Sequence, residues 1–146
     1  MTELMRRTGP RCVAALGAAL LPVVLLACGG GSSGAPKTLS LSGEQVPVSE
    51  VTGAYSQMCV IAKQAQSDPA GTVSAFANAE SGLGVLATVL NKDHGQESQR
   101  LLAALTTFTG DIGQKPPATT TGEAATNLLA TAKQGLVVLR ITPPAC

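Results

Sequence analysis

An uncharged apolar run from Cys12 to Ala27 is the feature that most constrains what this chain can fold into. It follows a short segment in which Arg6, Arg7 and Arg11 outnumber a single acid. A basic start, a short apolar stretch and a small residue at its end are typical of a secretory signal peptide. The run is shorter than the ~20 apolar residues of a spanning helix, and Pro22 interrupts it, so a permanent transmembrane helix is the weaker alternative.

The four residues Leu25-Leu26-Ala27-Cys28 resemble the lipobox of bacterial lipoproteins, in which a leucine and a small residue precede a cysteine. The resemblance covers the N-terminal part of the chain and names no domain family. It implies that the Cys28 thiol receives a diacylglyceryl group and that cleavage falls between Ala27 and Cys28. Two acyl chains, such as palmitate, anchor a protein stably where one would be marginal. The resemblance therefore implies a protein held by lipid on the extracytoplasmic face of the cell membrane.

Removal of residues 1–27 leaves 119 of the 146 residues, which is enough for one modest domain. In residues 28–46, Cys28 is followed by Gly29-Gly30-Gly31-Ser32-Ser33-Gly34, a composition that predicts a flexible tether. We expect an extended lead-in from Lys37 to Val46 and one folded domain over residues 47–146. The richness in alanine, glycine and threonine also resembles actinobacterial lipoproteins.

The charge balance argues against nucleic acid as a partner. After removal of the signal, 7 basic and 8 acidic residues remain, and none of the basic residues are clustered. Nucleic-acid binding depends on a basic patch that neutralises phosphates. We therefore expect the membrane, through the lipid on Cys28, and an envelope protein or a small ligand as partners.

Two cysteines remain once Cys12 leaves with the signal and Cys28 carries lipid. Cys59 and Cys146 form an even pair in an exported chain, and such pairs are typically oxidised to a disulfide. The alternative is that both are free thiols or metal ligands. A metal needs three or four ligands and the chain has one histidine, so we expect no metal and no cofactor.

Apolar residues recur at spacings of three and four in four segments, which predicts four amphipathic helices. Short polar loops separate them, and this favours an all-α fold, a small antiparallel four-helix bundle. The four predicted apolar stripes are Val51, Tyr55, Met58, Ala62 and Ala65; Val73, Phe76, Ala77, Leu83, Leu86 and Leu90; Leu101, Ala104, Leu105, Phe108 and Ile112; and Ala125, Leu128, Leu129, Ala132, Leu136 and Leu139.

Helix boundaries have their own sequence signals. Asp68-Pro69 predicts an N-cap followed by proline at the first position of the second helix. Thr120 and Glu123 have the spacing of a capping box at the start of the fourth. Gly82 and Gly84 weaken the second helix, and a bend or break there is one outcome that the sequence leaves open.

Glu80 is the strongest candidate for a ligand site. It lies on the apolar stripe of the second helix and stands beside small residues, so its carboxylate could line a pocket together with Tyr55 and Met58 of the first helix. The alternative is that Glu80 faces water or pairs with a basic side chain, since buried carboxylates are rare unless paired. Tyr55 and Met58 at helical spacing are more often core residues.

Two further motifs have structural explanations that we prefer. Asp93, His94 and Ser98 contain the residue types of a catalytic triad, but an acid adjacent to the histidine rarely reaches the far ring nitrogen. The loop Lys115–Thr121, with prolines and Thr119-Thr120-Thr121, could carry O-linked sugars or could be a solvated polar loop.

Three function classes remain. The first is a non-enzymatic binding or interaction module of the cell envelope, which we favour. The second is a carrier of a small or lipidic ligand between the helices near Glu80. The third, an enzyme using His94 or Glu80, ranks last. A cavity between the first two helices would favour the carrier, and a filled core with an exposed apolar patch would favour the interaction module.

Overall fold

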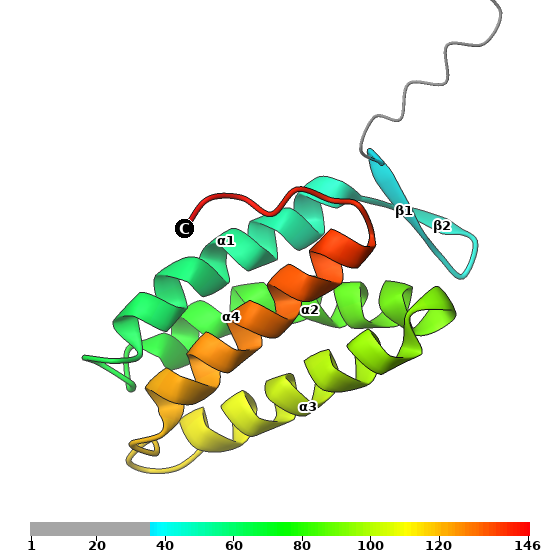
Figure 1. Ribbon diagram of the computed structural model, residues 1–146. Coiled ribbons are helices and arrows are strands. Elements are labelled where there is room, and N and C mark those ends of the chain that lie inside the picture. The colour runs from blue at the N-terminus through cyan, green and yellow to red at the C-terminus, as the bar shows by residue number, and fades with distance from the viewer. Residues whose placement is uncertain (1–35) are drawn as a thin grey trace, which may run out of the picture. The chain divides into compact units, whose positions relative to one another are not determined.

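The computed structural model describes residues 36–146, which belong to one compact unit. The predicted signal peptide, the lipidation at Cys28 and the tether lie outside the described residues. The described chain is mostly helical, as the apolar spacing predicted, and begins with a two-stranded sheet (Figure 1). Its elements are β1 (Thr38–Leu41), β2 (Glu44–Pro47), α1 (Val48–Gln64), α2 (Thr72–Asp93), α3 (Gly95–Ile112) and α4 (Thr121–Val138).

Helix α2 lies at the centre of the packing. It contacts α1, α3 and α4, and it also contacts β1, whereas α1 and α3 each pack against α4 as well (Figure 1). Among the described helices, α2 alone is long and apolar enough to cross a membrane by length and composition. Because its apolar side chains pack against every other helix, we assign it as the core helix of the folded domain.

The predicted stripes of α1 and α3 are confirmed, since all ten residues are buried. The stripe of α2 was partly wrong. Val73 is 45% exposed and Ala77 is exposed, while Thr72 and Gly82 take buried positions in their place. Burial of Thr72 is tolerated because its hydroxyl donates a hydrogen bond of 2.6 Å to the carbonyl of Pro69.

Asp68 is not the N-cap residue of α2, whereas Thr120 is the N-cap residue of α4 but makes no capping hydrogen bond with its side chain. The Asp68 carboxylate accepts from the backbone N–H of Gly71 at 3.0 Å, so it closes the turn before α2, and the helix starts three residues after Pro69. At α4, the Thr120 hydroxyl donates to the Asp111 carboxylate at 2.8 Å instead of capping its own helix. In each case the polar side chain stabilises the loop that precedes the helix.

Gly82 lies where α1 and α2 approach most closely, and α2 continues unbroken through it. A Cβ at Gly82 would lie 2.6 Å from the Cβ of Ala54 and 3.0 Å from the backbone oxygen of Glu50. Gly84 has no atom within 4 Å of the corresponding position. The bend or break considered for these glycines does not occur, and Gly82 instead permits the close approach of the two helices.

Residues 38–47 form a β-hairpin, where the sequence predicted an extended lead-in. Ser42 (φ 49°) and Gly43 (φ 93°) are the two loop residues, and positive φ at both is the geometry of the two-residue hairpin turn that matches strand twist. Leu39 pairs with Val46, and both side chains are buried against the helices. The Ser-Gly pair between two short alternating segments is the signal that could have identified this hairpin.

Helix α4 ends in a hydrogen-bonded turn that directs the C-terminal segment back along the domain. The N–H of Ile141 donates to the carbonyl of Leu136, and the N–H of Arg140 donates to that of Val137, both at 2.9 Å. This pair of bonds is the Schellman motif, and it places Arg140 in the left-handed region at φ 60°. The buried side chain of Ile141 packs on the core and fixes the exit direction.

Gly82→Ala should destabilise the domain, and Gly84→Ala provides the matched control. Overpacking at Gly82 forces α1 and α2 apart, and we expect a net loss of about 1–2 kcal/mol in the free energy of unfolding. At Gly84 the added methyl meets open space, so only the higher helix propensity of alanine acts and stability should rise by up to ~1 kcal/mol. Urea denaturation of both variants measures these changes. Equal effects of the two substitutions would contradict the assigned role of Gly82.

Candidate functional site

A disulfide between Cys59 and Cys146 organises one face of the domain, as the cysteine count predicted. Cys59 is a buried residue of α1, and Cys146 lies 87 residues further along the chain, in the segment that follows α4. Residues 141–146 therefore run back beside α1 and α4 (Figure 1). The bond holds this segment, which has no secondary structure of its own, against the helices.

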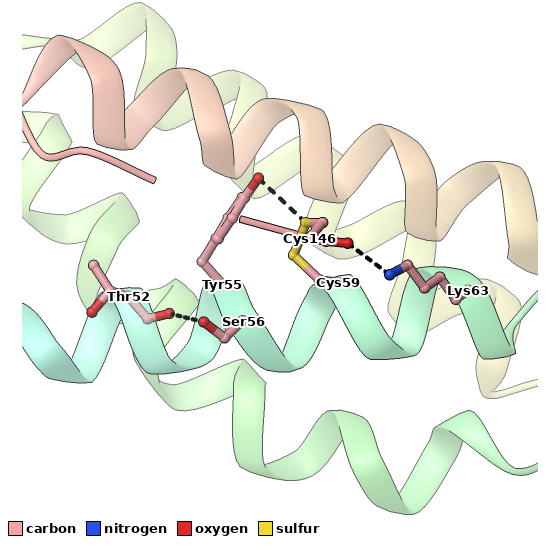
Figure 2. The surroundings of a disulfide bond; sticks show 6 residues. All are labelled: Thr52, Tyr55, Ser56, Cys59, Lys63 and Cys146. Atoms are coloured by element: carbon pink, nitrogen blue, oxygen red, sulfur yellow. Dashed lines mark hydrogen bonds between the residues drawn. A yellow bond between two sulfur atoms is a disulfide. The ribbon is translucent and has the colours of Figure 1, made fainter. Parts of the chain in front are cut away.

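Two side chains of α1 add polar contacts to Cys146 (Figure 2). The ammonium of Lys63 donates to the Cys146 backbone oxygen at 2.7 Å. The hydroxyl of Tyr55 lies 3.7 Å from the Cys146 sulfur, to which it can donate, and this satisfies the polar end of an otherwise buried ring. The C-terminal segment is thus held by the disulfide and by the contacts of Lys63 and Tyr55 with Cys146.

The candidate ligand residues Glu80, Tyr55 and Met58 do not come together in a pocket. Met58 is fully buried and Tyr55 is 3% exposed, so both are core residues, while Glu80 is exposed on α2. The apolar stripe misplaced Glu80 because Ala79 and Gly82, rather than Ala77 and Glu80, are the buried residues of this part of α2. Close contact between α1 and α2 at Gly82 also fills the space that such a pocket would need.

Asp93, His94 and Ser98, which have the residue types of a catalytic triad, lie at the junction between α2 and α3. Ser98 is buried, and its hydroxyl donates to the carbonyl of Ala87 at 2.7 Å, which ties the first turn of α3 to α2. His94 is half-buried at the junction, and Asp93 is exposed. The Ser98 hydroxyl is thus occupied by a main-chain acceptor, and this explains its position without catalysis.

The threonine loop before α4 is partly folded. Thr121 is buried and its hydroxyl donates to the carbonyl of Ala118 at 2.6 Å, and Thr120 is bonded to Asp111. Thr119 and Thr120 are both exposed, and Thr119 also lines a surface hollow. Sugar attachment at this loop stays a prediction, and of its three threonines only Thr121 is buried.

Three surface hollows meet on the outward side of α4. The largest, about 570 Å³, lies at the first turns of α4 against the loop after α1 and is lined by Ala65, Gln66, Pro69, Thr119, Gly122, Glu123, Thr126, Asn127 and Ala130. A second of about 450 Å³ has Tyr55, Leu129 and Lys133 opposite the C-terminal segment. A third of about 410 Å³ lies toward α3. Ala130 lines all three, because small side chains leave α4 recessed there.

Sequence reasoning missed this surface. Its residues come from three helices, from the loops after α1 and α3 and from the C-terminal segment, so no local spacing marks the whole surface. Among the described residues, no group of three or more His, Cys, Asp or Glu side chains could hold a metal ion. Comparison of the chain with protein-family models, with curated proteins and with solved structures gives no match.

Cys59→Ser should lower the melting temperature of the oxidised protein. The disulfide closes a loop of 87 residues, for which the chain-entropy model gives about 4–5 kcal/mol of stabilisation. Thermal unfolding followed by circular dichroism in non-reducing buffer measures the change. Cys146→Ser is the matched control, because it removes the same bond at the exposed end and should give a comparable loss. Unchanged melting of both variants would contradict a stabilising role.

Proposed function

We propose that this protein is a lipid-anchored, non-enzymatic interaction module on the extracytoplasmic face of a bacterial cell membrane. The observation that carries the proposal is the sequence Leu25-Leu26-Ala27-Cys28, which ends an apolar run and precedes a Gly/Ser-rich stretch. In this proposal, diacylglyceryl attachment to Cys28 holds the domain at the membrane and residues 29–36 give it reach. The helical domain is the part that meets other components of the envelope.

The proposal treats α1–α4 as a small antiparallel four-helix bundle. Short connections between successive helices and the contacts of α1 with α4, and of α3 with α4, support this arrangement. The β-hairpin then lies where the tether enters the domain. The loops after α1 and after α3 lie at the opposite end of the helices (Figure 1).

An interaction module is favoured over a carrier because the core is filled. Val51, Met58, Leu83, Leu86 and Leu90 are fully buried at the centre of the described domain. No buried side-chain nitrogen or oxygen of the described residues lacks a hydrogen-bond partner, so the interior offers no polar group to a cargo. The hollows on α4 are open to solvent, which suits contact with a macromolecule better than enclosure of a small ligand.

Cys28→Ala tests the anchor directly, with Cys12→Ala as the matched control. Without the thiol no diacylglyceryl group can be attached, and we expect the chain to keep residues 1–27 and to lose the lipid mass. Cys12→Ala changes a cysteine of the segment that is removed, so its mature mass should equal that of the wild type. Intact mass spectrometry of each protein, extracted from membranes, measures both changes. A wild-type mass without lipid would contradict the proposal.

Native mass spectrometry of the same membrane extract distinguishes an interaction module from a carrier. A native mass spectrum recorded in mild detergent reports any noncovalent ligand that travels with the protein. We expect a lipidated, oxidised polypeptide with no small-molecule adduct. A stoichiometric adduct of a small or lipidic molecule would favour the carrier instead.

A further inference from the structure

The outward face of α4 carries a regular exposed stripe. Glu123, Thr126, Ala130, Lys133 and Val137 follow one another at spacings of three, four, three and four, and all five are exposed. This spacing places them on one side of the helix, as in the contact seam of a coiled coil. Val137, at the C-terminal end of the stripe, is a large apolar side chain that is 54% exposed. The stripe is therefore a helix face without a partner in the described domain.

The charges of this stripe are complementary to those of the same stripe on a second copy in the antiparallel orientation. Glu123 lies near one end and Lys133 toward the other, and small residues separate them. A two-fold axis at the level of Leu128 would place Thr126 opposite Ala130 of a second copy. The same axis would place Glu123 opposite the partner's Lys133, and Lys133 opposite the partner's Glu123. We propose that two copies of this chain associate through α4 in this antiparallel, two-fold arrangement.

The neighbouring helices extend the same polarity. Asp111 of α3 lines a hollow together with Glu123, and Arg100 lines another together with Gln134. The surface formed by α4 and the neighbouring side of α3 thus has an acidic end and a basic end. Lys63, a cation on α1, already donates to the Cys146 backbone oxygen. Parallel pairing would bring like charges together, and such juxtaposition is costly at an interface, so the charge pattern selects the antiparallel arrangement.

The exposed valine and the largest hollow also match under this symmetry. With Thr126 opposite Ala130, Val137 comes to lie over the partner's residues 119–122. Of these, Thr119 and Gly122 line the hollow of about 570 Å³, whose other walls include Ala65 and Pro69. An apolar side chain of each copy is thereby placed at an apolar hollow of the other, twice by symmetry. Self-association explains both features together.

Covalent trapping is the suitable measurement, because an interface built on one helix from each copy is small. In the full-length protein in its own membrane, Ala130→Cys places one thiol per copy close to the proposed axis. A short bis-maleimide should then convert it to a dimer on a denaturing gel. Ser81→Cys places the same thiol on an exposed position of α2 and should give no dimer. Absence of a dimer from Ala130→Cys, or cross-linking to other proteins only, would overturn the proposal.

Charge reversal in the Ala130→Cys background tests the register. Glu123→Lys and Lys133→Glu each oppose like charges at both symmetry-related positions, and we expect each to lower the cross-linked fraction about tenfold. The double variant restores opposite charges and should restore the dimer. Coexpressed, the two single variants should cross-link to each other. Both side chains are exposed, so an unchanged melting temperature confirms that the fold is intact.

Glu80→Lys is the matched control for charge, because it reverses an exposed acid of α2 outside the stripe. It should leave the cross-linked fraction unchanged. A dimer that forms equally well in all charge variants would contradict the proposed register. The result is independent of the lipid anchor, since self-association is read from the cross-link and lipidation is read from the mass of the mature chain.

Discussion

The close approach of α1 and α2 at Gly82 is the contact on which the rest of the domain depends. The chain has two phenylalanines, one tyrosine and no tryptophan, so alanine and leucine must supply most of the buried area. Small side chains bury little surface unless the helix backbones come close together, and Gly82 against Ala54 provides that proximity. With α2 fixed in this way, Phe76 meets Phe108 of α3 edge-to-face with ring centroids 4.8 Å apart.

The C-terminal half of the domain joins this pair by different means. Gly135 allows α4 to approach Leu90 and Leu86 of α2, and the turn at Arg140 sends the chain back toward α1. The disulfide then connects α1 to the end of the chain. Residues on the opposite face of α4 are exposed in the described domain, and the proposed self-association uses that face.

The sequence pattern predicted the four helices and the disulfide because both leave strong signals, namely apolar spacing and an even pair of cysteines in a chain that we expect to be exported. It misplaced the buried face of α2, since Thr72 and Gly82 carry no hydrophobic signal and are buried for reasons of hydrogen bonding and close packing. That error placed Glu80 in a pocket that does not exist. The hollows on α4 could not be predicted because their walls come from segments distant in sequence, whereas the charged stripe of α4 was present in the spacing all along.

Amide hydrogen exchange of the protein, measured before and after reduction of the disulfide, tests the central role of the α1–α2 contact most directly. We expect the slowest amides to lie in α1 near Met58 and in α2 near Leu83, and to stay the slowest after reduction. The amides of Arg140 and Ile141 should exchange faster once the C-terminal segment is released. If the slowest amides lay in α3 and α4 while those around Gly82 exchanged early, the close contact of α1 and α2 would not be what the domain depends on.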